Sequence, residues 1–326
     1  MSSVVIIGCP YGALKGLTLS LKGMTGDETK IISVEDIGSV SDKEITLETG
    51  KIYRYDQVRS SHIRYPYDLI PPHTSTFVKR EKTEFLKSIA LLLSPVSVND
   101  VGNAWRMRNR LFSLHRARAH GLRTPKSLLS RDFIDRKRLR ERLDDSESGV
   151  ATKAIGNCYV ASQDASVSKS LRSFVTLAED DGESAYIFPA SLLSESDVIE
   201  YLDAVNCTFV QEAIRPAVEY RCYLVAESVF VYEREKTDSF DQSAATYHAT
   251  DYSLGQNTRE GIKELMIAMD FQYICFDVLV TNTGSEVVID INPFGSLPPH
   301  DRFPVPTKRL ASLLLNPPDD MVDGKS

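Results

Sequence analysis

The stretch VVIDINPFG, from Val287 to Gly295, has the pattern of an apolar β-strand with two polar residues near its end. Successive side chains of a strand point to opposite faces, so Asp290 and Asn292 direct their oxygens to the same face. The strand then stops at Pro293, because proline has no backbone N–H to offer a neighbouring strand. The stretch therefore predicts a strand end that presents two oxygen ligands side by side.

The residues before this stretch, YICFDVLVTNTGSE, add a second apolar run and a polar, glycine-containing turn, which together predict a β-hairpin. A two-residue turn at Thr283 and Gly284 places Asp277 directly opposite Asp290. Like charges that face each other in a strand pair are destabilising, and more so on a half-buried face where neither is well hydrated. We therefore expect a positive group between the two carboxylates.

Asp277, Asp290 and Asn292 together offer three oxygen ligands from two strands. Such a set suits a hard cation such as Mg²⁺, which keeps several waters and usually completes its shell with phosphate oxygens. The alternative is that the three residues only cap and solubilise an exposed hairpin. The register favours the metal site for the trio, although it would not for a single aspartate.

The composition is that of an ordinary soluble globular protein of two or three packed units, with 326 residues, 42% of them hydrophobic and 25% charged. No apolar run approaches the roughly 20 residues that span a bilayer. The first residues lack the basic segment and cleavage site of a signal peptide, so we expect a cytoplasmic protein without a membrane partner. The five cysteines are scattered and the six histidines form no ligand pair, so neither a disulfide framework nor a zinc site is expected.

The net charge of −7 argues against general affinity for nucleic acid, but the charge is unevenly distributed. Residues 105–142 are rich in Lys and Arg, with Asp132, Asp135 and Glu141 as their only acidic residues. Most of these basic side chains are expected on a solvated helix face, and a few could line a site for an anion or a peptide. The segment lacks interleaved aromatic residues, so a nucleic-acid interface is not expected there.

Residues 1–95 have the pattern of a small α/β domain. SVVIIGCPYGALKGLTLSL predicts a strand, a turn and a helix, and short strands follow in TKIISVEDI and EITLETGKIYRYDQVRSSHIRYP. The glycine spacing at the first turn is not G-x-G-x-x-G, so a Rossmann-type cofactor site is not expected.

The next segment, NAWRMRNRLFSLHRARAHGLRTPKSLLS, predicts one amphipathic helix with Leu111, Leu114 and Ala117 to Ala119 near one stripe. Gly121 and Pro125 form its stop signal. The rest of the chain is expected in this order: a basic helix over 132–143, a strand VATKAI, two helices around a strand AYIFPA over 165–205, the strands of NCTFVQEAI and EYRCYLVAESVFVYERE, the hairpin, and a disordered tail over 317–326.

In this order the segments resemble the ATP-grasp superfamily over roughly residues 100 to 300. The resemblance is carried by a basic residue on a helix before GLRTP, a strand lysine in VATKAI, and then FVQEAI, EYR, FDV and IDINP. It implies an α/β (α+β) protein with the ATP-grasp fold. The implied domains are an N-terminal α/β pre-ATP-grasp domain over 1–95, a central subdomain with a lid over 96–205, and a C-terminal subdomain over 206–316 that carries the metal site.

The resemblance also implies ATP and Mg²⁺ as cofactors and assigns them residues. Lys153 would supply a point charge to the phosphates, and Arg110, where the family usually has a lysine, would do the same with a planar fork. Gln211 and Glu212 would lie near the adenine, and Glu219 is expected among the nucleotide-binding residues. The residues that match the family's Mg²⁺ ligands are Asp277, Asp290 and Asn292.

Two branches of the superfamily are similar to different parts of the chain. RPAVEYRCYLV, YERE and VVIDINPFG resemble the cell-division-cycle ATP-grasp proteins that help assemble a translation initiation factor, which also have Asp at the position of Asp290. SSHIRYP and NRLFSLHRARAHGLRTPKSLLS resemble bacterial peptide ligases of the microviridin type and ribosomal-protein glutamyl ligases. The chain departs from those ligases at Arg110 and at Asp290, where the shorter side chain favours one firmly held ion over two.

The resemblance implies an ADP-forming ligase that converts a carboxylate into an acyl phosphate and joins it to an amine or hydroxyl of a peptide or amino acid. Arg221 and Arg234 would stabilise the phosphoryl transition state and the acyl phosphate. A salt bridge between Glu219 and Arg221 is the alternative role for Arg221, since the two share a strand face.

A second hypothesis is a non-catalytic assembly factor that binds ATP and Mg²⁺ while it clamps a protein partner. Under either hypothesis the basic segment 105–142 could hold an acidic peptide or the acidic tail of a partner. The resemblance also makes a homodimer possible. The donor and acceptor substrates do not follow from the sequence, because they depend on the shapes of loops.

Overall fold

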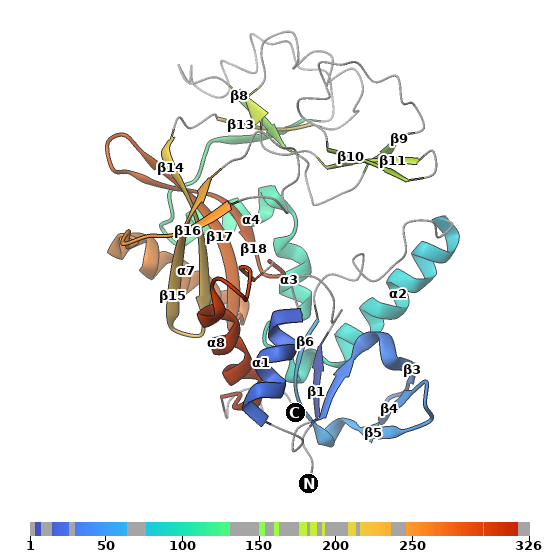
Figure 1. The fold of residues 1–326 in the computed structure, drawn as a ribbon. Helices are drawn as coiled ribbons and strands as arrows, with labels where there is room; N and C mark the ends of the chain where they lie inside the picture. The colour runs from blue at the N-terminus through green and yellow to red at the C-terminus, as the bar shows by residue number, and fades with distance from the viewer. Residues whose placement is uncertain are drawn as a thin grey trace.

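The computed structural model describes residues 4–7, 15–25, 30–63, 76–130, 150–153, 160–162, 176–180, 183–187, 191–192, 208–212, 216–235, 246–295 and 297–318. Figure 1 shows an N-terminal part around β1 and β6, a large antiparallel sheet formed by β14 to β18, and a group of shorter strands around β8 and β13. The predicted basic helix over 132–143 and the predicted tail from residue 319 onward lie outside the described residues.

The N-terminal part is a small α/β unit, as the sequence predicts. Its parallel sheet has the order β2-β1-β6, and a second, antiparallel sheet has the order β3-β4-β5. Ile6, Ile32 and Ile89 lie in its core, where α2 packs against the sheets. Its elements are β1 (Val4–Ile7), α1 (Lys15–Thr25), β2 (Lys30–Ser33), β3 (Ile37–Val40), β4 (Glu44–Leu47), β5 (Ile52–Arg54), β6 (Val58–His62), α2 (Thr76–Leu92) and short 3₁₀ turns at Val34–Asp36, Tyr55–Gln57 and Ser94–Val96.

The single amphipathic helix predicted after this unit is two helices, α3 (Val101–Met107) and α4 (Arg110–Ala119). Asn109 breaks it, because its backbone is extended and its side-chain oxygen accepts the N–H of Phe112 at 3.0 Å, as an N-cap does. The predicted end is confirmed, since Gly121 has a φ of 74° that favours glycine.

The shorter strands form two sheets. A four-stranded sheet has the order β12-β8-β13-β7, and a three-stranded sheet has the order β10-β11-β9. A helix was predicted before AYIFPA, but β10 occupies residues 176–180, where it pairs with β11. The bounds are β7 (Ser127–Ser130), β8 (Val150–Lys153), β9 (Val160–Ser162), β10 (Thr176–Asp180), β11 (Glu183–Ile187), β12 (Ser191–Leu192) and β13 (Thr208–Glu212).

The large antiparallel sheet has the order β16-β15-β14-β17-β18 and is covered by helices on both faces. Along β14, Cys222 packs into the core that contains α7, and Tyr223 packs into the core that contains α1 and α8. The sheet face that carries Tyr223 is polar nearer the start of β14, where it carries Arg221 and Glu219. The bounds are β14 (Pro216–Val225), β15 (Ser228–Glu235), β16 (Thr246–Ala249), α7 (Gln256–Met269), β17 (Tyr273–Thr281), β18 (Glu286–Asn292) and α8 (Pro304–Leu315).

The hairpin of β17 and β18 has the predicted pair but a different turn. Thr281 donates its N–H to the carbonyl of Ser285 at 2.9 Å, so the loop holds three residues and not two. Gly284 closes the loop with a φ of 77°. The pairing of the two strands then shifts by one residue next to Asp277, which restores Asp277 opposite Asp290.

Candidate active site

The candidate site lies on the face of the large sheet that packs against α1 and α8, at the polar end of this face, where the two aspartates of the hairpin meet. Asp277 and Asp290 are cross-strand partners, and Asn292 pairs with Cys275 two positions further along the same strands. The Asn292 side-chain oxygen accepts the N–H of Phe294 at 2.9 Å, so this residue also fixes the turn that follows β18. Two opposed carboxylates and an amide oxygen are hard ligands, and this donor set fits Mg²⁺.

Asp277 is 4% exposed and is held by two arginines. Arg221, its partner across β14 and β17, places Nη1 at 2.9 and 2.8 Å from the two carboxylate oxygens. Arg234 places its Nη1 at 3.5 Å from one of them. The positive charge expected beside the aspartates is therefore present as guanidinium groups.

Arg234 also binds Glu219, so one guanidinium connects two buried carboxylates. Its Nη1 lies 3.1 Å from a carboxylate oxygen of Glu219, which is 7% exposed. A salt bridge between Glu219 and Arg221 was the expected alternative to a catalytic role. The ion pairs described here join Arg221 to Asp277 and Glu219 to Arg234.

Both arginines remain charged in this setting. Burial lowers the pKa of the Arg221 guanidinium, but Asp277 and other neighbours together raise it by more, so the pKa lies well above its ordinary value. Burial acts in the same way on Arg234, whose pKa Asp277 and Glu219 raise. The Nε atoms of Arg221 and Arg234 are buried and have no hydrogen-bond acceptor among the described residues, so each side chain keeps a spare donor.

Arg110, the first residue of α4, belongs to the same site. Its Nε lies 3.2 Å from a carboxylate oxygen of Asp290, and the two side chains are only 13% and 24% exposed. Asn109 starts α4 at this position, so the helix cap that sequence analysis overlooked is also what presents Arg110 to Asp290. The structure thus places Arg110 in contact with Asp290, one of the metal-ligand candidates.

The remaining predicted site residues lie on two adjacent strands of the four-stranded sheet. Lys153 of β8 pairs with Phe209 of β13, and Gln211 pairs with Ala151, with Glu212 next along the strand. The side chains of these residues are outside the described part of the chain, so their roles stay predictions. Figure 1 shows β8 and β13 above the ends of β14, β17 and β18.

Asn99 is a site residue that sequence analysis missed. It is 6% exposed, and its amide nitrogen donates to the carbonyls of Tyr273 at 2.7 Å and Pro293 at 3.0 Å. Its oxygen accepts the N–H groups of Gln272 and Tyr273, both at 3.0 Å. It therefore ties the start of β17 to the residue that follows the Asn292 ligand. No local pattern marks it, because its three partner residues are far away in the sequence.

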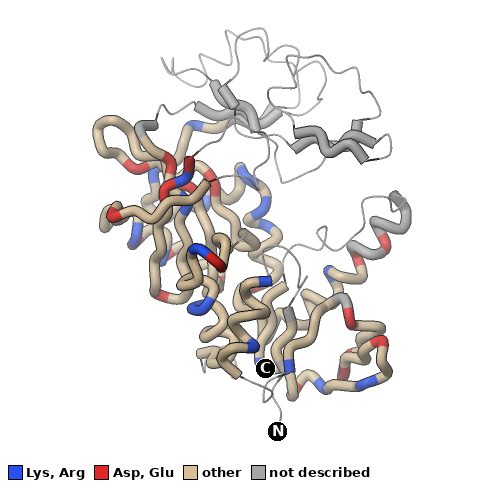
Figure 2. The backbone as a smooth tube through the Cα atoms, viewed as in Figure 1, with Lys and Arg blue, Asp and Glu red and all other residues tan. Residues whose placement is uncertain are grey.

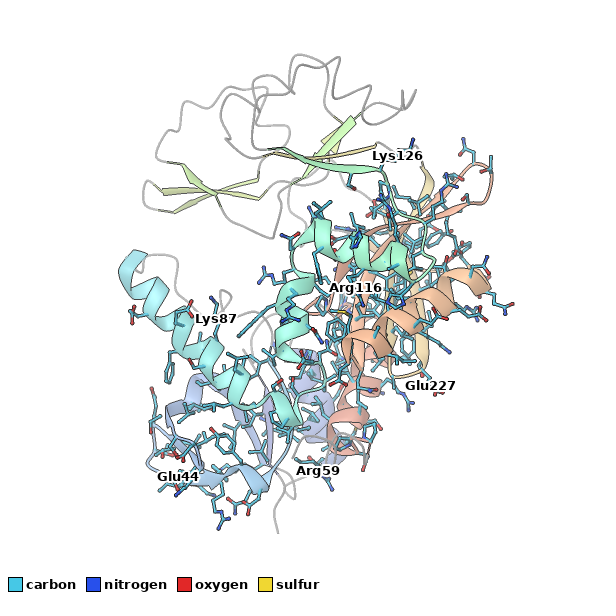
Figure 3. The ribbon with its side chains drawn as sticks, turned by 180° about the vertical axis from the view of Figure 1, so that it is seen from behind. Glu44, Arg59, Lys87, Arg116, Lys126 and Glu227 are labelled. Atoms are coloured by element: carbon cyan, nitrogen blue, oxygen red, sulfur yellow. The ribbon has the colours of Figure 1, made fainter. Side chains whose placement is uncertain are left out.

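A separate hollow of about 580 Å³ lies on α3, α4 and the start of β7, within the basic segment. Leu111, Phe112 and Leu114 supply apolar surface, and Arg106 and Arg118 contribute positive charge. Figure 2 shows several Lys and Arg along α4, and Figure 3 labels Arg116 of α4 and Lys126, which follows α4 in the chain. The hollow combines an apolar floor with basic side chains.

Two features are absent from the described part of the chain. No helix in it is long and apolar enough to cross a membrane. Likewise, its His, Cys, Asp and Glu residues form no group of three suited to a metal ion, so the candidate metal site depends on the amide of Asn292 beside two carboxylates.

Comparison with known proteins identifies the fold. No protein-family model matches the chain, and no curated protein sequence matches it. The macrocyclase MdnC from Microcystis aeruginosa MRC, bound with its precursor peptide MdnA, has a TM-score of 0.68 at 19% identity and covers 96% of this chain and 99% of its own. An ATP-grasp ligase associated with ribosomal peptides from Chryseobacterium gregarium, in complex with ADP and a leader and core peptide, has a TM-score of 0.68 at 15% identity and covers 97% of both chains.

A third solved structure, the ATP-grasp ligase PsnB with a phosphomimetic minimal precursor, Mg and ADP, has a TM-score of 0.67 at 15% identity. It covers 97% of this chain and 98% of its own. The chain therefore has the ATP-grasp fold along almost its whole length, as its sequence predicts. The resemblance of the C-terminal half to assembly factors stays a prediction.

Proposed function

We propose that the protein is an ATP-dependent ligase that activates a carboxylate as an acyl phosphate and joins it to an amine or hydroxyl of a peptide. The observation that carries the proposal is the convergence of Asp277, Asp290 and Asn292 with Arg221 and Arg234 on one polar sheet face. Support comes from the fold, which the chain shares from end to end with ATP-grasp ligases that bind precursor peptides.

In this proposal the two aspartates and Asn292 hold Mg²⁺, which supplies charge neutralisation for the triphosphate when it is bound. Arg110 and Lys153 bind phosphate oxygens, and Gln211 and Glu212 lie beside the adenine. Arg110 can reach the phosphates from the helix start where it now contacts Asp290.

Arg221 and Arg234 act on the transferring phosphoryl group and on the acyl phosphate. Their positive charge is fixed by buried carboxylates on neighbouring strands, and their buried Nε donors have no acceptor among the described residues. Guanidinium groups held beside the transferring phosphoryl group stabilise the negative charge that develops on it, which is how phosphoryl transfer is accelerated. Glu219 positions Arg234 and so belongs to the nucleotide site indirectly.

The substrate that fits best is a peptide with an acidic, partly apolar recognition segment. The hollow on α3 and α4 has an apolar floor at Leu111 and Phe112 and positive charge at Arg106 and Arg118. Such a surface favours an amphipathic segment with negative side chains. Recognition there would leave the reacting part of the peptide free to enter the carboxylate site.

The test is ADP formation from Mg·ATP by the purified protein with a library of acidic peptides, followed by mass spectrometry of the peptides. The proposal predicts ADP release only with some peptides, each of which loses the mass of one water per bond formed within it or gains the mass of a joined group. Stabilisation by ATP without ADP under any condition would instead support the assembly-factor hypothesis.

A further inference from the structure

The described side chains of the site balance their own charges before any ligand binds. Three carboxylates, Glu219, Asp277 and Asp290, are in contact with three guanidinium groups, Arg110, Arg221 and Arg234. Arg234 connects Glu219 to Asp277, and Asp277 faces Asp290 across the hairpin. The ion pairs form two groups, Arg110 with Asp290 and Arg221 with Asp277, Arg234 and Glu219, and these groups meet where Asp277 and Asp290 face each other.

This charge balance weakens the binding of a metal ion that comes without a nucleotide. Both oxygens of Asp277 lie within 2.9 Å of the Arg221 Nη1, and one oxygen of Asp290 lies 3.2 Å from Arg110. A divalent cation would have to displace these guanidinium groups, which would then stay as uncompensated positive charges at a partly buried site. Free metal should therefore bind weakly, although the ligand set is correct.

A nucleotide removes this obstacle because its phosphates accept hydrogen bonds from the same guanidinium groups. Arginine binds phosphate and carboxylate oxygens with the same planar fork, so the exchange keeps each guanidinium paired. The Arg221 Nε, buried and without an acceptor among the described residues, offers a further donor. Arg234 would keep Glu219 as its anchor throughout.

We infer that Arg110 and Arg221 prevent tight binding of a divalent cation on its own, because they occupy the carboxylates that would ligate it. When the cation binds together with a nucleotide, the two arginines exchange their carboxylate partners for phosphate oxygens, and the carboxylates can then bind the cation. The inference rests on the proposed ATP- and Mg²⁺-dependent function. It adds that metal and nucleotide bind with strong mutual dependence, and that two arginines cause this dependence.

The experiment is a titration of the purified protein with Mn²⁺, followed by the electron paramagnetic resonance signal of the free ion, with and without a non-hydrolysable ATP analogue, and Mn²⁺ bound by the analogue itself is subtracted by a titration without protein. The expected result for the wild type is weak binding without the analogue and affinity at least about a hundredfold higher with it, since the analogue supplies the anionic partners. Equal affinity in both titrations would overturn the inference and leave the proposed function intact. No binding in either titration would overturn both.

The variants Arg110→Gln and Arg221→Gln test the assigned cause. Each should bind Mn²⁺ alone at least about tenfold more tightly than the wild type, because it frees a carboxylate and removes a nearby positive charge. Arg116→Gln, on the same helix as Arg110, is the control for a simple change in net charge and should stay within about twofold. Unchanged Mn²⁺ affinity in both test variants would overturn the exchange. If one variant fails to fold by circular dichroism, the other still tests the assigned cause, since an unchanged Mn²⁺ affinity in it would overturn the exchange at that arginine.

Discussion

Asp277 and Asp290 face each other across β17 and β18 because two irregularities in the hairpin cancel. The turn is one residue longer than a two-residue turn at Thr283 and Gly284 would be, and a shift in the strand pairing next to Asp277 compensates. Without that shift, the longer turn would put Ile289 opposite Asp277. The carboxylate pair is thus a product of the bulge as much as of the alternation of strand residues.

Gly284 should be needed for stability but not for ligand binding. With its φ of 77°, a Gly284→Ala substitution is expected to cost about 1 kcal/mol of unfolding free energy in urea denaturation. Gly23→Ala, in α1 with nothing within 4 Å of the added Cβ, should instead raise the free energy of unfolding, because alanine favours a helix. Mg·nucleotide affinity should be unchanged in both variants, and a large loss of affinity in Gly284→Ala would show that the turn itself sets the site.

Asn99→Ala should destabilise the protein by about 2 to 4 kcal/mol, because four hydrogen bonds of a buried side chain are lost and their backbone partners stay buried. It should also weaken Mg·nucleotide binding, since Pro293 directly follows Asn292. Asn282→Ala, at the exposed tip of the hairpin, is the matched control and should change neither quantity. The measurements are urea denaturation and isothermal titration. Wild-type stability in Asn99→Ala would contradict the bracing role of this residue.

Arg234→Gln should lower the free energy of unfolding by about 3 kcal/mol. The substitution removes the positive charge that compensates the buried Glu219 and one of the two guanidinium groups beside Asp277. The double variant Arg234→Gln with Glu219→Gln should recover a large part of that loss, since the uncompensated carboxylate is gone. Thermal and urea denaturation of Arg234→Gln, of Glu219→Gln and of the double variant, beside the wild type, form a double-mutant cycle. Purely additive effects would show that Glu219 and Arg234 are not coupled.

Charge reversal at the hollow should act on substrate recognition alone. Arg106→Glu is expected to raise the KM for an acidic peptide about tenfold at low salt with kcat unchanged, because the residue lies at the hollow and not at the carboxylate site. Arg259→Glu, on the exposed surface of α7, carries the same change in charge and should have little effect. A fall in kcat with constant KM would assign Arg106 to the chemical step instead.

The alternation of strand residues predicts the face that Asp290 shares with Asn292, whereas the predicted pairing of Asp277 with Asp290 is correct only because the bulge compensates for a turn longer than the predicted one. The order of motifs was enough to predict the fold. The sequence did not reveal that β14 lies between β15 and β17, which is why the pairing of Arg221 with Asp277 and of Arg234 with Glu219 could not be foreseen. Contacts between distant strands depend on the packed sheet and not on local pattern.

Two local predictions were wrong for reasons that are visible in the structure. Asparagine has a modest preference for the interior of a helix but a strong preference for the N-cap position just before a helix. As the N-cap of α4, Asn109 splits the one predicted helix into α3 and α4. The strand β10 replaced a predicted helix because pairing with β11 outweighs the weak intrinsic preference of its residues. The first of these errors lies at the hollow on α3 and α4, which Asn109 lines.

The most direct test of the central claim is isothermal titration of the wild type and Asp290→Asn with a non-hydrolysable ATP analogue, with and without Mg²⁺. The metal site predicts that Mg²⁺ strengthens nucleotide binding in the wild type and that this gain disappears in Asp290→Asn, while circular dichroism shows an unchanged fold. Nucleotide affinity that is the same in both proteins, with Mg²⁺ present, would contradict the assignment of Asp277, Asp290 and Asn292 as the metal site.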